Sequence, residues 1–199
     1  MEIEVKLKLS GPEAHEKVAT LLKPYHSLAQ IQENVFFDGA NKELSSRKSV
    51  LRLRFYDVDK QCVVTYKGEA VIESGISRGE ELEEEINVVV GRDYVANPKN
   101  MLTSNCQLIK TVVSKFGVKD FVCLGGFRNI RNVYKWERLK IELDETQFDF
   151  GTAYEVECED TDPERVRKVL GNLLESNGIE YTYSTKSKFA VFRSGKLDD

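Results

Sequence analysis

Residues 1–9 read Met1-Glu2-Ile3-Glu4-Val5-Lys6-Leu7-Lys8-Leu9, an unbroken alternation of charged and apolar side chains. Successive side chains of a β-strand point to opposite faces of the sheet. The stretch therefore predicts a strand with one apolar face and one charged face. The charged face carries Glu2, Glu4, Lys6 and Lys8. Taken alone, this pattern is typical of an edge strand with one solvated face.

The same alternation recurs along the chain with both signs of charge, which predicts further strands. We expect strands at about residues 29–38, 50–57, 62–67, 78–87, 127–135, 137–144 and around 155–159. Helices are predicted by capping residues and apolar stripes at about residues 10–24, 92–101, 104–116, 161–178 and 185–194. Residues 68–79 are small and polar and predict a mobile loop. Short strands joined by turns, with a few helices between them, favour an α+β fold with one antiparallel sheet.

Length and charge limit the functional classes. The 199 residues fit a single domain spanning 1–199, with room for a sizeable core. Charged residues make up 31% of the chain, yet the formal net charge is only −4. Acids and bases are interleaved, which argues against a nucleic-acid-binding protein. We expect a monomer that acts on a small molecule.

Cysteine usage and hydropathy indicate the compartment. The four cysteines show no CxxC spacing, and two histidines cannot build a zinc site. Free thiols in a reducing compartment are therefore expected. No apolar run is long enough to span a membrane, and no basic-then-apolar signal region is present. These features predict a soluble, cytoplasmic protein without a membrane partner.

The charged faces of the strands, taken together, suggest more than a solvated surface. About eight antiparallel strands tend to close into a barrel, because closure removes the exposed edges. The expected fold is therefore a closed eight-stranded antiparallel β-barrel with helices packed outside and a charged lumen. The acids on this face are Glu2, Glu4, Glu83, Glu85, Glu142, Asp144, Glu155 and Glu157. The bases are Lys6, Lys8, Arg52, Arg54, Lys67 and Lys140.

Such a lumen needs counterions of both signs. Two carboxylates about 6 Å apart repel by roughly 3 kcal/mol at an effective dielectric near 20. Oxygen-only acidic ligands favour Mg²⁺ or Mn²⁺, whereas closely spaced Arg and Lys favour phosphate. A divalent metal together with a polyphosphate satisfies both sets of charges.

The motifs and their order resemble the CYTH superfamily, the triphosphate tunnel metalloenzymes. This group includes thiamine triphosphatases, class IV adenylyl cyclases, inorganic tripolyphosphatases and fungal RNA triphosphatases. Its ExExK hallmark matches Glu2-Ile3-Glu4-Val5-Lys6. The later matching elements are Phe36-Phe37-Asp38, Arg52-Leu53-Arg54, Lys67, Glu83-Glu84-Glu85, Leu143-Asp144, Glu155-Val156-Glu157 and Lys186. ExExK alone is a weak signal, but ordered elements over nearly the whole chain are specific.

The resemblance implies roles for these residues. Phosphate binding is implied for Lys6, Arg52, Arg54, Lys67 and Lys186, and a first metal ion for Asp144, Glu155 and Glu157. Glu2 and Glu4 would hold or orient a second metal ion, which would present the attacking water. The family often has a Lys-x-Arg pair where this chain has Arg128 and Arg131, which lie at opposite parity in a strand. We predict that Arg131 points inward. In a helix over residues 185–194, Lys188 would lie about 200° round from Lys186, so we expect Lys186 to point inward and Lys188 to point away.

The predicted activity is hydrolysis of the terminal phosphoanhydride of inorganic tripolyphosphate with one or two Mg²⁺ or Mn²⁺ ions. No nucleophilic Ser-His or Cys-His set is readable, so positioning and charge neutralisation should carry catalysis. Arg52 is the candidate for stabilising the leaving group. Lys8, Lys140 and Arg131 complete the candidate substrate-binding residues, while Glu83, Glu85 and Glu142 are acidic residues without an assigned role.

Other functions remain open. A thiamine or nucleoside triphosphatase or a class IV cyclase would need a pocket for the organic group, and the sequence shows none. A non-catalytic polyphosphate-binding module would need the cations but not the paired ExE motifs. The two ExE motifs therefore favour an enzyme over the binding module.

Overall fold

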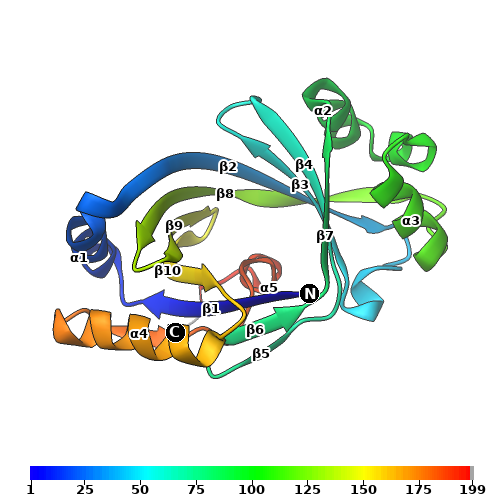
Figure 1. Ribbon diagram of the computed structural model, residues 1–199. Helices are drawn as coiled ribbons and strands as arrows, with labels where there is room; N and C mark the ends of the chain where they lie inside the picture. Colours follow the sequence, from blue (N-terminus) through cyan, green and yellow to red (C-terminus); the bar gives the residue numbers. More distant parts are fainter. Residues whose placement is uncertain (198–199) are drawn as a thin grey trace. The chain divides into compact units, whose positions relative to one another are not determined.

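The computed structural model describes residues 1–197 (Figure 1). Its strands are β1 (Glu2–Leu9), β2 (His26–Gly39), β3 (Val50–Tyr56), β4 (Gln61–Lys67), β5 (Val71–Glu73), β6 (Ile76–Gly79), β7 (Glu81–Ile86), β8 (Phe121–Trp136), β9 (Leu139–Phe148), β10 (Gly151–Glu159) and β11 (Tyr181–Tyr183). Its α-helices are α1 (Pro12–Leu22), α2 (Val88–Ala96), α3 (Gln107–Phe116), α4 (Pro163–Ser176) and α5 (Lys188–Ser194). Three short 3₁₀ helices are η1 (Lys23–Tyr25), η2 (Ser45–Arg47) and η3 (Pro98–Thr103).

The strands form one 11-stranded sheet, which corrects the predicted closed eight-stranded barrel. The hydrogen-bonded order is β5-β6-β1-β10-β9-β8-β2-β3-β4-β7, and β11 pairs with β1. Within residues 1–197 this path starts at β5 and ends at β7, so the sheet is open. The terminal strands have three and six residues. Closure requires matched rows of free backbone groups on the two end strands, and strands this short offer few.

Residues 68–79 contain a β-hairpin rather than the predicted loop. Glu73 pairs with Ile76, so only Ser74 and Gly75 form the turn, and both have positive φ (50° and 75°). Such left-handed residues suit a two-residue hairpin turn. A Cβ on Gly75 would lie 3.2 Å from the backbone oxygen of Lys6, and the Lys6 N–H donates to the Gly75 oxygen over 2.7 Å. Glycine thus permits the close approach of this turn to β1.

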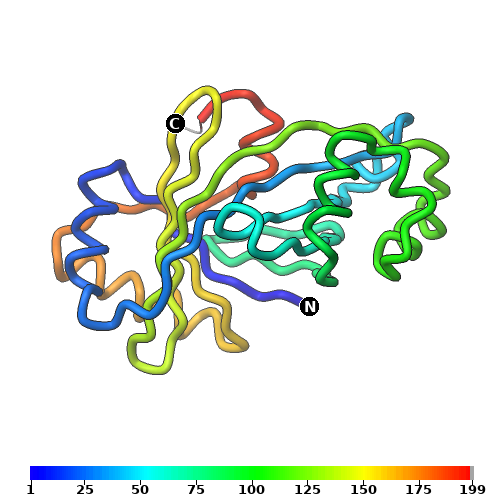
Figure 2. The backbone as a smooth tube through the Cα atoms, turned by 90° about the horizontal axis from the view of Figure 1, so that it is seen from above, coloured from blue at the N-terminus to red at the C-terminus, as the bar shows by residue number. Residues whose placement is uncertain are grey.

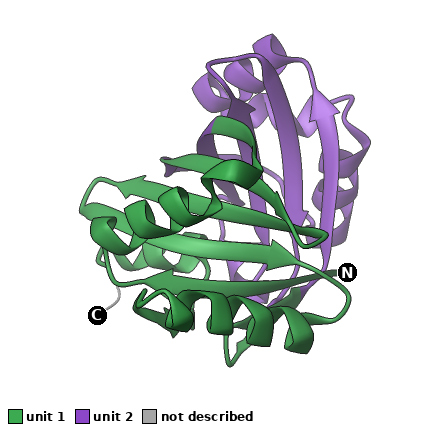
Figure 3. Cartoon of the chain, turned by 60° about the vertical axis from the view of Figure 1, so that its left-hand side comes forward, with its two compact units in different colours: residues 1–30, 71–78, 128–199 green, residues 31–70, 79–127 purple. Residues whose placement is uncertain are grey.

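The chain divides into two compact units, coloured green and purple in Figure 3. Unit 1 contains residues 1–30, 71–78 and the chain from 128 on, whereas unit 2 contains residues 31–70 and 79–127. Each unit is assembled from separate stretches of sequence. The single domain expected over residues 1–199 stays a prediction.

Unit 1 places helices on the apolar side of its strands. Helix α4 packs against β1, while α1 packs against β9 and β10. Asp162 caps α4 by accepting a hydrogen bond from the Arg165 N–H, and Pro163 occupies the first turn, as the sequence predicts. The core includes Val5, Leu7, Val18, Leu22, Ile141, Leu143, Val156, Leu170 and Leu174. The alternate side chains of these strands, which are charged, therefore face away from the helices.

Unit 2 is built in the same way around β3 and β4. Helix α3 packs against β4 and β7, and α2 packs against β4. The core of this unit includes Leu51, Leu53, Phe55, Val64, Tyr66, Ile109, Val112 and Phe116. Arg52 and Arg54 alternate with Leu51, Leu53 and Phe55 and project from the opposite side of β3.

Two expectations about the rest of the chain can be checked. Among residues 1–197 all cysteines are free thiols, as predicted: Cys62, Cys106 and Cys158 are buried and Cys123 is exposed. Within the same residues, the helices are too short or too polar to cross a lipid bilayer.

Candidate active site

Strand register places opposite charges side by side in unit 1. The strands β8, β9 and β10 follow one another through tight turns, as the backbone path in Figure 2 shows. Asp144 of β9 lies opposite both Arg131 of β8 and Glu155 of β10. Glu157 of β10 lies opposite Glu142 on one side and Lys6 of β1 on the other. The alternation within each strand then brings these side chains to one face.

These residues form the unit 1 charge cluster, which consists of Glu4, Lys6, Arg131, Glu142, Asp144, Glu155, Glu157 and Lys188. Lys188 stands at the start of α5, and its ammonium nitrogen is the meeting point of three carboxylates. Its Nζ lies 2.9 Å from Oδ2 of Asp144, 2.7 Å from Oε2 of Glu155 and 2.5 Å from Oε1 of Glu157.

Arg131 is the second centre of the cluster. Its Nε and Nη2 donate to the two oxygens of Asp144 over 2.7 and 2.6 Å, which is the bidentate arrangement. Nη2 also donates to Glu157 over 2.7 Å, and Nη1 donates to Glu142. The prediction that Arg131 rather than Arg128 points inward agrees with these contacts, because Arg128 is exposed.

The pKa shifts of the cluster favour the charged form of each group, because pairing outweighs burial. Burial disfavours the charged form of Glu157, but Lys188, Lys6 and Arg131 outweigh it and hold the pKa of Glu157 well below the usual range. The pKa of Asp144 is lowered against the same burial by Arg131 and Lys188. Burial would lower the pKa of Lys6, but Glu157 and the neighbouring acids raise it well above its ordinary value. All these groups are therefore charged at neutral pH.

The donors around Lys188 have the chemistry of a metal site. Asp144, Glu155 and Glu157 offer only oxygen ligands, which suit Mg²⁺ or Mn²⁺. Within residues 1–197, however, no three Asp, Glu, His or Cys side chains are grouped so that they could hold a metal ion as they stand. The three carboxylates converge on a cation that the chain itself supplies, the ammonium group of Lys188. The donor set fits a hard divalent ion if this ammonium group moves aside.

Unit 2 carries a second set of charges, the unit 2 arginine cluster, made of Arg52, Arg54, Thr65, Lys67, Glu81 and Glu83. Arg52 donates from Nη2 to the hydroxyl of Thr65 over 2.9 Å. Its contacts with Glu83 and Glu81 are longer, at 3.5 and 3.8 Å. Lys67 lies 2.6 Å from Glu81.

Arg52 retains an unsatisfied donor. Its Nε is buried and has no hydrogen-bond partner among the residues that the structure describes. Burial and the neighbouring Arg54 lower the pKa of Arg52 to about 10, which still leaves it charged at neutral pH. Arg54 is held by neutral groups, donating from Nε to Asn34 over 2.8 Å and from Nη1 to Tyr56 over 3.5 Å. A buried cation with an unmet N–H is suited to an anionic oxygen.

The remaining predicted site residues are placed as follows. Glu2 is half-buried at the start of β1. Lys140 has a side chain that is 66% exposed and lies 2.6 Å from Glu142 at the margin of the unit 1 charge cluster. Lys8 and Lys186 both line a cavity in unit 1, and Lys186 is exposed.

In unit 2, Glu83 accepts a hydrogen bond from the Thr65 hydroxyl over 2.9 Å, which ties it to the arginine cluster. Glu85 is exposed and accepts from Gln61 over 2.8 Å. The structure thus draws Glu83 into contact with Arg52 and leaves Glu85 outside those contacts.

Sequence reasoning missed two residues of the C-terminal segment. We expected Lys186 to reach the site and Lys188 to point away, on the assumption of a helix over residues 185–194. The helix instead starts at Lys188, because the Ser187 hydroxyl caps it by accepting from the Ala190 N–H. Ser184, also overlooked, donates to Glu155 over 2.7 Å. Ser187 was the sequence signal for the helix start, because serine is a preferred N-cap residue.

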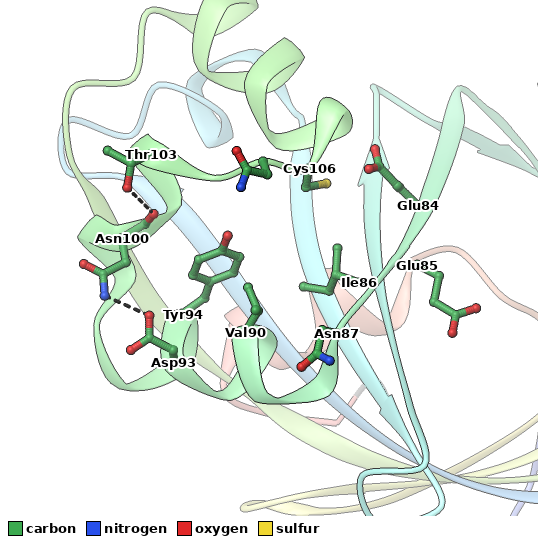
Figure 4. A pocket seen from close by; sticks show the side chains of 11 residues that line it. Glu84, Glu85, Ile86, Asn87, Val90, Asp93, Tyr94, Asn100, Thr103 and Cys106 are labelled. Carbon is green, nitrogen blue, oxygen red and sulfur yellow. Dashed lines mark hydrogen bonds between the residues drawn. The ribbon is translucent and has the colours of Figure 1, made fainter.

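A pocket in unit 2 of about 520 Å³ lies beside β7, the strand that carries Glu83-Glu84-Glu85 (Figure 4). Glu84 lines it and accepts hydrogen bonds from the backbone N–H groups of Gln107 and Leu108, at 3.1 and 2.8 Å. These bonds lower the pKa of Glu84 and cap α3. The middle residue of Glu83-Glu84-Glu85 is therefore a helix cap.

Comparison with known proteins identifies the family. The CYTH domain model matches residues 1–192. The solved structure of HpAC1 from Hippeastrum, described as a candidate adenylyl cyclase that reveals a dominant triphosphatase activity, is 49% identical with a TM-score of 0.96, covering 99% of this chain and 97% of that one.

More distant relatives share the fold. A candidate adenylate cyclase of Methanocaldococcus jannaschii is 25% identical over 178 residues, 88% of this chain and 86% of that protein. A solved candidate adenylate cyclase of Bacillus halodurans has a TM-score of 0.75 at 18% identity, covering 96% and 97% of the two chains. The family model spans nearly the whole sequence, so this chain belongs to the CYTH domain family.

Proposed function

We propose that the protein is a metal-dependent hydrolase that cleaves the terminal phosphoanhydride of inorganic tripolyphosphate into pyrophosphate and phosphate. It acts as a monomer on this small-molecule substrate. Support comes from HpAC1, a relative with 49% identity that is described as having a dominant triphosphatase activity. The likeness to HpAC1 supports triphosphatase activity in general. The choice of tripolyphosphate as the substrate rests on the charged clusters described above.

The observation that carries the proposal is an acidic centre in unit 1, and an unsatisfied cation in unit 2 supports it. Two buried carboxylates and one half-buried carboxylate in unit 1 surround the ammonium nitrogen of Lys188. In unit 2, Arg52 keeps a buried Nε without a partner among the described residues. The first set suits a divalent cation and the second an anionic phosphate oxygen. A metal-bound polyphosphate is the class of substrate that contains both kinds of group.

The proposed roles follow from this chemistry. Asp144, Glu155 and Glu157 would hold Mg²⁺ or Mn²⁺, and Glu2 and Glu4 would hold a second ion or orient the attacking water. When bound, the metal supplies neutralisation of phosphate charge and lowers the pKa of water. The phosphate oxygens would be bound by Lys6, Lys8, Arg52, Arg54, Lys67, Arg131, Lys140 and Lys186.

In the reaction, the oxygen of a water molecule bonds to the terminal phosphorus while the bond from that phosphorus to the bridging oxygen breaks. One proton leaves the water, and pyrophosphate departs with the bridging oxygen. Arg52 is the proposed partner of the departing pyrophosphate, since its buried guanidinium stays charged and offers a free N–H. Fixed donors of this kind stabilise the charge that develops in the transition state.

The test measures phosphate release from tripolyphosphate, ATP, thiamine triphosphate and pyrophosphate, each with Mg²⁺, Mn²⁺ or EDTA. We expect the highest kcat/KM with tripolyphosphate and no release in EDTA. A higher kcat/KM for ATP or thiamine triphosphate would refute the choice of substrate. The same reactions are assayed for cyclic AMP, because the three relatives described above are candidate adenylyl cyclases by name. Tight tripolyphosphate binding without turnover would instead favour a binding module.

A further inference from the structure

Ser184 lies between β11 and α5 and joins the C-terminal segment to two residues of the unit 1 charge cluster. It is only 5% exposed. Its backbone N–H donates to the backbone oxygen of Lys6 over 3.1 Å, which continues the pairing of β11 with β1. Its hydroxyl donates to Oε1 of Glu155 over 2.7 Å. The serine is thus fixed to β1 and in turn holds a carboxylate on β10.

The hydroxyl decides which oxygen of Glu155 faces the cation. With Oε1 engaged by Ser184, Oε2 is the oxygen that lies 2.7 Å from Nζ of Lys188. Asp144 is fixed differently, by the two-point contact with Arg131. The neutral hydroxyl of Ser184 thus engages Glu155, whereas a guanidinium group engages Asp144.

Glu155 also has room to turn away. Glu155, Ser184 and Lys188 all line a cavity of about 1510 Å³ within unit 1. A glutamate beside open space can adopt several rotamers, and each rotamer lost on binding costs free energy. A hydrogen bond that selects one rotamer beforehand removes part of this cost.

We propose that Ser184 is a positioning residue that orients Glu155 for a divalent cation. The proposal rests on the function proposed above, in which Asp144, Glu155 and Glu157 are metal ligands. Hydrogen bonds from outside the ligand set orient metal ligands, and their loss typically lowers metal affinity by about 10–100-fold. Ser184 itself touches neither metal nor substrate in this role.

The experiment compares Ser184→Ala, which removes the hydroxyl, with Ser184→Thr, which keeps it. Thr185→Ala is the matched control, because it deletes a hydroxyl from the adjacent exposed residue. Mn²⁺ binding to the protein without substrate is measured by calorimetry, and the Mn²⁺ concentration for half-maximal tripolyphosphate hydrolysis is measured alongside. Ser184→Ala should weaken Mn²⁺ binding by about 10-fold or more. Its kcat at saturating Mn²⁺ should stay within about two-fold of the wild type, as expected when ligand orientation alone is lost.

Ser184→Thr and Thr185→Ala should bind Mn²⁺ like the wild type. The proposal is overturned if Ser184→Ala binds Mn²⁺ as tightly as Thr185→Ala, or if it lowers thermal stability and kcat without changing metal affinity. If Ser184→Thr does not fold, the comparison of Ser184→Ala with Thr185→Ala still decides whether Ser184 orients Glu155. A wild-type protein that neither binds Mn²⁺ nor releases phosphate would refute the proposed function and this inference with it. An active, metal-binding wild type with an unchanged Ser184→Ala refutes the inference alone.

Discussion

Arg131 in unit 1 and Arg52 in unit 2 are alike in type and burial, yet their charges are balanced differently. Their side chains are 12% and 10% exposed. Burial lowers the pKa of both, but Asp144, Glu142 and Glu157 raise that of Arg131 well above its ordinary value. Burial and Arg54 lower the pKa of Arg52 to about 10. The pKa values of the two arginines therefore differ because of the number and distance of their carboxylate partners, and not because of burial.

The two arginines differ in how far the protein's own carboxylates satisfy their N–H groups. Arg131 is engaged by the protein's own carboxylates at 2.6 and 2.7 Å, so it neutralises the acidic centre. Arg52 meets its carboxylates only at 3.5 and 3.8 Å and keeps an unpartnered Nε among residues 1–197. The cations of the unit 1 charge cluster are engaged by carboxylates, whereas Arg52 of unit 2 keeps a buried N–H without a partner among residues 1–197.

Loss of one carboxylate from the unit 1 charge cluster should have the largest effect on turnover. Glu157→Gln keeps the size of a side chain that contacts Lys6, Arg131 and Lys188 but removes its charge. We expect kcat for tripolyphosphate at saturating substrate to fall by about 100-fold or more, because a proposed metal ligand is lost. Steady-state kinetics and circular dichroism check this. Glu159→Gln, two residues further along β10 and exposed, is the control. Normal turnover in a folded Glu157→Gln protein would eliminate the metal assignment.

The two arginines should then respond differently to the same change. Arg52→Lys keeps the charge but loses the planar fork, so KM for tripolyphosphate should rise by about 10-fold, the loss of one charge-assisted hydrogen bond. The value of kcat should fall as well, because Arg52 is the proposed partner of the departing pyrophosphate. Arg131→Lys should mainly reduce the free energy of unfolding, by about 1–3 kcal/mol, since buried carboxylates lose donors. Urea titration and Michaelis–Menten kinetics on both variants separate these effects. Equal effects on KM and on stability would contradict the contrast between the units.

Lys188 tests whether the internal cation and a divalent ion use the same carboxylates. Lys188→Met removes the ammonium group from Asp144, Glu155 and Glu157, which leaves three carboxylates without their shared partner. The variant should be less stable without metal and should bind Mn²⁺ several-fold more tightly, because the carboxylates repel one another until a cation binds. Thermal melts with and without Mn²⁺, together with calorimetry, measure both quantities. Lys196→Met serves as the exposed control. Weaker Mn²⁺ binding in Lys188→Met would show that the lysine supports the metal instead.

The acid side of the stability curve should show the smallest effect. The pKa of Glu157 is held well below its ordinary value of 4.5. A depressed carboxyl pKa adds stability that is present above the unfolded-state pKa and disappears as the pH falls through the folded-state pKa. The stability difference between wild type and Glu157→Gln should therefore shrink as the pH decreases from 6 towards 3. Urea unfolding at several pH values in EDTA measures it. A difference that is independent of pH would mean that ionisation of Glu157 does not contribute.

Local patterns were enough to predict several strands and the residues on their charged faces. Strict alternation located β1 and β3 to within one residue, because a strand's two faces are decided by parity alone. The same parity predicted that Arg131 and Arg128 would separate, and Arg128 is exposed. The start of α4 followed from Asp162 and Pro163, which act on neighbouring backbone groups.

Tertiary structure decided the closure of the sheet and the partners of the charges. The closed barrel was wrong because closure depends on which strands form the two ends, and the sequence concealed the β5–β6 hairpin in a stretch that resembles a loop. Lys188 enters the cluster because the Ser187 cap sets where α5 begins.

The contrast between Arg131 and Arg52 could not be predicted from sequence either. Both stand on charged strand faces, and parity identifies the face but not the residues opposite. Alternation is a property of one strand and was present in the sequence from the start. Charge balance depends on register between strands and on distances across them, and those exist only once the chain has folded.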